Sequence, residues 1–89
     1  MSTKTWTVQL TLDEEGDDTR VEATLRPDDI KEVRGRGVSR RNPRDESEPR
    51  IGDELAAARA LSDLAHQLLA AAAADIEAKT HVPARSLQL

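Results

Sequence analysis

The chain has 89 residues and a net charge of −4, with a single aromatic residue, Trp6, and no cysteine. Its length gives room for one domain, and the missing cysteine excludes disulfides, thiolate metal sites and cysteine nucleophiles. No stretch is long and apolar enough to span a membrane, and the first residues lack the apolar segment of a secretory signal. We therefore expect a single soluble, cytoplasmic domain over residues 1–89.

Charge is distributed unevenly along the chain. Residues 1–33 hold nine acids and four bases, residues 34–50 hold six arginines and three acids, and residues 51–89 hold five acids and three bases. The acidic total argues against a general polyanion binder, because nonspecific affinity for nucleic acid grows with the number of phosphates neutralised. The central arginine block is the one region that could serve a confined anionic site.

The first segment alternates apolar and polar residues from Trp6 to Leu12, which is typical of a strand with one solvated face, and we place that strand at about residues 4–12. An acidic run around Gly16 follows and predicts a hairpin turn. Val21, Ala23 and Leu25 then alternate with polar residues, so a second, antiparallel strand is expected at about residues 19–26.

A third strand is expected at about residues 31–40, although its alternation is less regular. Gly35 and Gly37 share one parity of this segment. Since glycine weakens a strand, two glycines in phase indicate a bulge or the close approach of another backbone. An alanine-rich helix lying on this strand would explain both glycines sterically.

The remainder of the chain divides into a polar loop at 41–51, a helix at about 53–78 and a tail at 79–89. A helix of 26 residues is about 39 Å long, whereas an eight-residue strand spans about 26 Å. Its apolar and alanine arc also covers more than half of the circumference. We therefore predict a homodimer that covers the surplus face. The predicted dimer contacts lie along one side of the helix: Ala57, Leu61, Leu64, Leu68 and Ala71.

No set of residues has the spacing of a catalytic or metal site. Asp63 and His66 share a helical face, but Ser62 points about 100° away from Asp63, so a nucleophilic triad is not expected there. His66 and His81 are the only histidines, and neither has a carboxylate at a ligand spacing. We expect no enzyme activity, no metal, no cofactor and no small-molecule substrate.

The arginine block suggests two alternatives. Arginine forks fit phosphates bidentately, so a basic face could track an RNA backbone. The same arginines could instead solubilise an edge strand or pair with acids of the hairpin or of a partner. The candidate phosphate-binding residues are Arg34, Arg36, Arg40, Arg41 and Arg44.

Two segments carry a resemblance to a known family: Trp6-Thr-Val8, and Ser39-Arg-Arg-Asn-Pro43 followed by the helix from Ile51. Over about residues 4–82 the chain resembles a small actinobacterial family that is classed as a domain of unknown function. The resemblance implies a β-β-β-α fold similar to double-stranded-RNA-binding domains, a tendency to dimerise and an association with stress and dormancy. The architecture is also similar to ribosome hibernation-promoting factors without their first helix.

Two departures from these patterns concern the basic residues. The family usually has aliphatic residues around 33–36, where this chain has two arginines. The last helix of double-stranded-RNA-binding domains begins with a lysine cluster, whereas this one begins Gly52-Asp53-Glu54. Likeness of fold alone does not establish function.

The sequence thus predicts an α+β protein with a three-stranded antiparallel sheet followed by one long helix. The first functional hypothesis is a non-enzymatic, homodimeric stress or dormancy factor that associates with RNA or the ribosome, like a hibernation factor. The alternative is a protein-interaction or scaffold module without nucleic-acid binding.

Overall fold

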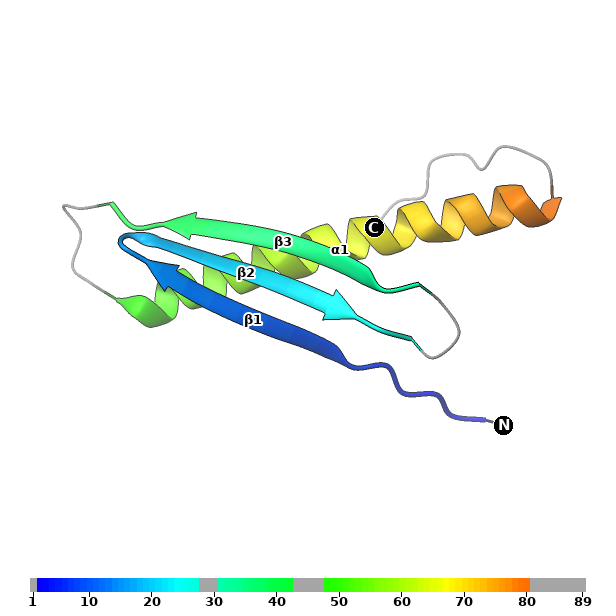
Figure 1. Cartoon of the computed structure of the whole chain (residues 1–89), viewed down its shortest axis with the longest axis horizontal. Helices are drawn as coiled ribbons and strands as arrows, with labels where there is room; N and C mark the ends of the chain where they lie inside the picture. The colour runs from blue at the N-terminus through cyan, green and yellow to red at the C-terminus, as the bar shows by residue number, and fades with distance from the viewer. Residues whose placement is uncertain (1, 28–30, 43–47, 81–89) are drawn as a thin grey trace.

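A computed structural model describes residues 2–27, 31–42 and 48–80, and these residues form three strands followed by one helix (Figure 1). The elements are β1 (Val8–Glu15), β2 (Asp18–Leu25), β3 (Val33–Arg40) and α1 (Pro49–Thr80). The strands are antiparallel in the order β1-β2-β3, and α1 packs on one side of the sheet. The predicted α+β fold is confirmed.

β1 and β2 form a tight hairpin around Gly16 and Asp17. Gly16 adopts a φ of 61°, in the left-handed region that glycine enters without a steric cost. Glu15 pairs directly with Asp18, so the turn needs only two residues. β1 therefore continues to Glu15 instead of ending near residue 12 as expected, because such a short turn leaves the acids free to extend the ladder.

The sheet has a side that faces the helix and a side that faces solvent, and the alternation of β2 fixes both. Val21, Ala23 and Leu25 are buried against α1. The helix contributes Ala56, Ala60 and Leu64 to the same core, at spacings of four residues that keep them on one face. No aromatic residue belongs to this core, so its stability depends on the close approach of small side chains.

The two glycines of β3 allow that close approach. A Cβ atom added at Gly35 would lie 2.7 Å from Leu64 Cα, and closer still to Leu64 N and Ala60 O. At Gly37 it would lie 2.8 Å from the carbonyl carbon of Arg59, with backbone atoms of Ala56 and Ala60 nearer. The steric explanation predicted for these glycines is confirmed: the helix backbone occupies the space that a side chain would need.

The helix begins earlier than the sequence pattern indicated. It starts at Pro49 and ends at Thr80, whereas residues 53–78 were expected. Proline suits the first helical position because its fixed φ is already helical and its missing N–H has no helical partner there. A helix of 32 residues is about 48 Å long, and its C-terminal part extends past the sheet (Figure 1).

Candidate functional site

The helix covers β2 and β3 but leaves much of β1 exposed. Register pairs Val8 with Leu25, Leu10 with Ala23 and Leu12 with Val21, so these three β1 residues point to the helix side of the sheet. They are nevertheless 39%, 37% and 42% exposed. A row of aliphatic side chains therefore lies beside the core without being covered by it.

One flank of α1 adjoins this row. Arg59 and Asp63 reach the outer edge of β3, which fixes the rotation of the helix about its axis. At about 100° per residue, Ala57, Leu61 and Leu68 lie on the opposite flank, toward β1. Leu61 is 43% exposed. We call the surface formed by Val8, Leu10, Leu12, Ala57, Leu61 and Leu68 the open strip.

The residues that were predicted to contact a second copy differ in how far they are exposed. Leu61 is exposed, and Ala57, Leu68 and Ala71 are half-buried. Leu64 is only 3% exposed and belongs to the subunit's own core, so its assignment to a dimer interface is wrong. The helical repeat places Leu64 over Gly35, where the absence of a Cβ atom lets the helix backbone approach the sheet closely.

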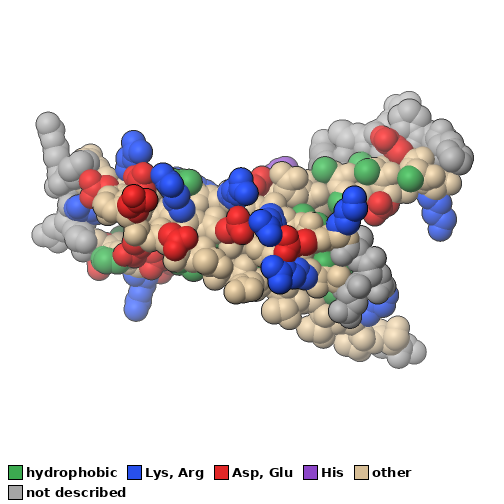
Figure 2. All heavy atoms as spheres, in the orientation of Figure 1, with side chains coloured by type: hydrophobic (Ala, Val, Ile, Leu, Met, Phe, Trp, Pro, Cys, Tyr) green, Lys and Arg blue, Asp and Glu red, His purple; other side chains and the backbone are tan. Residues whose placement is uncertain are grey.

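The solvent side of the sheet carries charges of both signs, as Figure 2 shows. Register places Arg20, Arg34, Arg36 and Arg40 on this side together with Asp13, Glu15, Asp18 and Glu22. Arg34, Arg36 and Arg40 thus share one side of β3. Four acids share it, however, so the face is balanced rather than basic.

Each of the four arginines described from the predicted phosphate-binding set is paired with an acid. Arg40 donates from Nε and Nη2 to the two carboxylate oxygens of Asp18 at 2.8 and 3.3 Å, and Arg41 donates to Asp17 at 2.7 Å. Arg36 lies 3.5 Å from Glu22, its direct cross-strand partner. The fourth, Arg34, donates to Glu32 at 2.6 Å. Arg44 lies outside the described residues.

These contacts change the acidity of two carboxyl groups. The hydrogen bonds from Arg40 lower the pKa of Asp18. Hydrogen bonds from Arg26 and Arg34 lower the pKa of Glu32. Both acids are therefore held as carboxylates, which offsets the positive charge of the arginines that a phosphate would otherwise meet.

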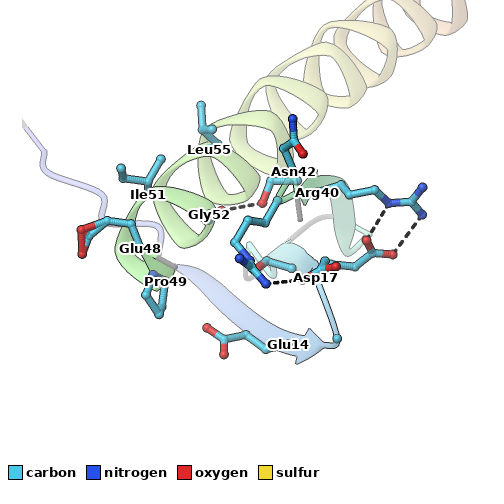
Figure 3. A pocket seen from close by; sticks show the side chains of 14 residues that line it. Glu14, Asp17, Arg40, Asn42, Glu48, Pro49, Ile51, Gly52 and Leu55 are labelled. Atoms are coloured by element: carbon cyan, nitrogen blue, oxygen red, sulfur yellow. Dashed lines mark hydrogen bonds and ion pairs between the residues drawn. The ribbon is translucent and has the colours of Figure 1, made fainter. Parts of the chain in front are cut away.

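A shallow hollow of about 290 Å³ lies where the hairpin meets the start of α1 (Figure 3). Its lining combines Arg40 and Arg41 with Glu14, Asp17 and Glu48. Arg40 is paired with Asp18 and Arg41 with Asp17, as the dashed lines in Figure 3 show. Both arginines at the hollow thus already have a carboxylate partner within the chain.

Two polar residues of the helix have structural partners that sequence reasoning missed. Asp63 Oδ2 accepts a hydrogen bond from the backbone N–H of Arg36 at 2.8 Å, and Arg59 Nη1 donates to the carbonyl of Val38 at 2.7 Å. His66 Nδ1 lies 2.7 Å from the carbonyl of Ser62, one turn earlier. The sequence analysis considered Asp63 and His66 only as candidates for a nucleophilic triad or a metal site, and the four-residue spacing of Arg59 and Asp63, which puts both on one side of the helix, was the available signal.

Within residues 2–27, 31–42 and 48–80, no three His, Asp or Glu side chains come together as metal ligands would. In the same part of the chain, no helix combines the length and the apolar character that crossing a membrane requires.

Comparison with known proteins places the chain among mycobacterial relatives. It is 51% identical to the uncharacterized protein Mb1767 of Mycobacterium bovis over 82 residues, which cover 92% of this chain and 86% of that protein. It is 46% identical to the uncharacterized protein Rv2632c of Mycobacterium tuberculosis over 84 residues, which cover 94% and 89%. The crystal structure of Rv2632c matches with a TM-score of 0.83 at 44% identity, covering 93% of this chain and 98% of that one. Residues 4–85 also match the family described as Rv2632c-like, and the chain belongs to this family.

Proposed function

We propose that this chain is a non-enzymatic protein-interaction module that associates with a second copy of itself through the open strip. The exposure of Val8, Leu10 and Leu12 on the helix side of the sheet carries this proposal. A strand side that faces a helix normally becomes core, yet this row is covered only in part.

The proposed contact is continuous from β1 to α1. Leu61 stands on the flank of the helix that adjoins the β1 row, so strand and helix offer one apolar surface instead of scattered side chains. Contiguous apolar surface of this kind marks interaction sites, whereas single exposed leucines do not. A two-fold axis would let both copies use the same residues.

Measuring the mass in solution tests the proposal. Light scattering coupled to size exclusion should give about twice the chain mass of 9.8 kDa at micromolar concentration. The substitution Leu61→Glu places a charge in the strip and should raise the dissociation constant at least tenfold. Leu55→Glu is the matched control, because Leu55 has a similar exposure, 46%, but lies outside the open strip, beside the hollow at the start of the helix.

A monomer at high micromolar concentration would contradict the proposal. It would also be contradicted if Leu55→Glu weakened association as much as Leu61→Glu. Circular dichroism of both variants shows whether each subunit is still folded, which keeps a loss of association distinct from unfolding.

The second candidate is the association with RNA or the ribosome that the sequence suggested, as part of a stress or dormancy response. The presence of Arg34, Arg36 and Arg40 on one solvent side of the sheet favours it. Their acidic partners Glu22, Glu32 and Asp18 weigh against it, because a phosphate would have to displace them. For this reason we place self-association first.

Co-sedimentation with ribosomes at low and high salt tests the second candidate. Salt-sensitive association that drops when Arg40 and Arg41 become alanine would support it. Absence of co-sedimentation at low salt would exclude it and leave the interaction module as the remaining function.

A further inference from the structure

The two edges of the sheet differ in a way that points to one mode of association. At the β3 edge, the N–H of Arg36 donates to Asp63, and the carbonyl of Val38 accepts from Arg59. Both side chains come from α1, one turn apart. The helix therefore occupies two hydrogen-bonding groups in the middle of this edge that an added strand would need, which obstructs pairing there.

The same two hydrogen bonds fix the direction of the backbone groups across the whole sheet. In antiparallel ladders, the backbone groups of alternate residues point to opposite neighbours. The backbone N–H and C=O groups of Arg36 and Val38 point away from β2. The odd-numbered residues of β3 are therefore the ones that exchange backbone hydrogen bonds with the odd-numbered residues of β2. The even-numbered residues of β2 then exchange backbone hydrogen bonds with Gln9, Thr11, Asp13 and Glu15 of β1. The N–H and C=O groups of the remaining β1 residues point away from the sheet: Val8, Leu10, Leu12 and Glu14.

The β1 edge has none of the protection found at β3. Among residues 2–27, 31–42 and 48–80, the outward backbone groups of Val8, Leu10 and Leu12 have no hydrogen-bond partner. The segment from Val8 to Leu12 contains no charge, no proline and no bulge, and it pairs regularly with β2. Long, regular, uncharged edges pair readily with other strands, and proteins usually block them.

We infer that β1 pairs with β1 of a second copy, antiparallel, and so joins the two sheets into one of six strands. The inference deepens the self-association proposed above and rests on it. It assigns the contact to the strand edge, with the open strips of the two copies meeting on the helix side of the joined sheet.

The charges of β1 select the antiparallel direction. Acids gather at its hairpin end, at Asp13, Glu14 and Glu15, whereas Lys4 precedes the other end. Parallel pairing would place the two acidic ends side by side, which is destabilising. Antiparallel pairing separates them and brings each acidic end toward the partner's Lys4.

The side-chain pattern also restricts the register, and a two-fold axis at Leu10 satisfies it. With the two-fold axis at Leu10, Leu10 of one protomer lies opposite Leu10 of the other, and Val8 lies opposite Leu12. Apolar side chains of the two protomers therefore meet on the helix side of the sheet. On the solvent side Gln9 faces Thr11, and Asp13 faces Thr7. Moving the axis by three residues toward the hairpin would place Asp13 opposite Asp13, which the repulsion of like charges disfavours.

Cross-linking tests this register directly, because the chain has no cysteine of its own. Gln9→Cys and Thr11→Cys are made as separate proteins, mixed and mildly oxidised. Facing residues in a pair without hydrogen bonds have Cα atoms about 4.5 Å apart, within disulfide range. We expect the mixture to cross-link at least tenfold faster than either protein alone. A mixture of Gln9→Cys with Thr24→Cys on β2 is the matched control and should stay uncross-linked.

Amide hydrogen exchange of the unsubstituted protein provides a second measurement. The N–H groups of Leu10 and Leu12 should exchange at least tenfold more slowly at concentrations where the protein is dimeric than after dilution to monomer. A dimer by light scattering with neither selective cross-linking nor this protection would overturn the strand pairing and leave the proposed function standing. A monomer throughout would overturn both.

Discussion

Substituting Gly35 by alanine should separate the helix from the sheet. The added Cβ would lie 2.7 Å from Leu64 Cα and closer to Leu64 N and Ala60 O, whereas ordinary contacts begin at 3.4 Å. Backbone atoms in the middle of a long helix cannot rotate away as a side chain can. The helix must therefore retreat by about 1 Å, a gap that forfeits up to about half of each dispersion contact across the interface.

The expected loss is large because the core is small. Overpacking costs about 1–3 kcal/mol where side chains can adjust, and a clash with backbone belongs at the upper end, about 3 kcal/mol. A chain of 89 residues has a free energy of unfolding of about 4–13 kcal/mol, so one methyl group would remove a substantial share of it. Ala60 and Leu64, which make the contact, are buried to 0% and 3% exposure.

Urea denaturation followed by far-ultraviolet circular dichroism, at one protein concentration, measures this loss. Gly52→Ala is the matched control, because its Cβ would meet only the side-chain oxygens of Thr19 and Ser39, at 3.3 and 3.4 Å. That variant should stay within about 1 kcal/mol of the parent, since alanine also favours the helix. A Gly35→Ala protein as stable as the Gly52→Ala protein would refute the steric argument.

Three further outcomes follow from the structure. Leu64→Ala should lower the free energy of unfolding by about 2–5 kcal/mol in the same urea assay, and the exposed Leu55→Ala by less than about 1 kcal/mol; equal losses would show that Leu64 is not core. Because the hydrogen bond from Arg40 lowers the pKa of Asp18 in the folded state, the stability that this carboxylate contributes is present at neutral pH and is lost as the pH falls through the acidic range where carboxyl groups take up protons. Asp18→Asn should therefore be less stable than the parent at neutral pH, and the gap should close in acid; urea midpoints at a series of pH values check this, and a gap that widened in acid would contradict it. Replacing Arg59 and Asp63 together by alanine should unblock the β3 edge and give species larger than dimers by light scattering, whereas an unchanged mass would show that these side chains do not guard the edge.

Several elements could be predicted from local patterns alone. Alternation placed all three strands, and the long run without proline or glycine placed the helix. Gly35 and Gly37 predicted the contact with the helix, because two glycines in phase within a strand indicate that another backbone approaches closely. These features depend on residues close together in sequence, where periodicity and steric need act directly.

Element ends were less predictable. The pattern from Asp13 to Asp18 suggested a long acidic turn, but a two-residue turn at Gly16 and Asp17 keeps most of those acids in strands. Pro49 was assigned to the loop, although a proline is well suited to begin a helix. In both cases the local residues permit two conformations, and tertiary packing selects between them.

The candidate interaction surfaces depended on relationships that cross between elements. Arg36 and Glu22 are fourteen residues apart, and only the register of β2 on β3 makes them neighbours. The balance of charge on the solvent side of the sheet could not be read from a block of arginines by itself. Likewise, the wide apolar arc of the helix could not reveal that Leu64 belongs to the subunit's own core while Leu61 stays exposed.

The amino-acid order by itself determined the class of fold, the excess length of the helix and the need for glycine beneath it, since these follow from periodicity, residue count and the size of a side chain. Tertiary structure decided how the helix is rotated about its axis. That rotation buries one apolar row, closes the β3 edge with Asp63 and Arg59, and leaves β1 uncovered. The physical reason is that alanine lies on several sides of this helix, and the close contact at Gly35 and Gly37 together with the hydrogen bonds of Asp63 and Arg59 selects one side to face the sheet.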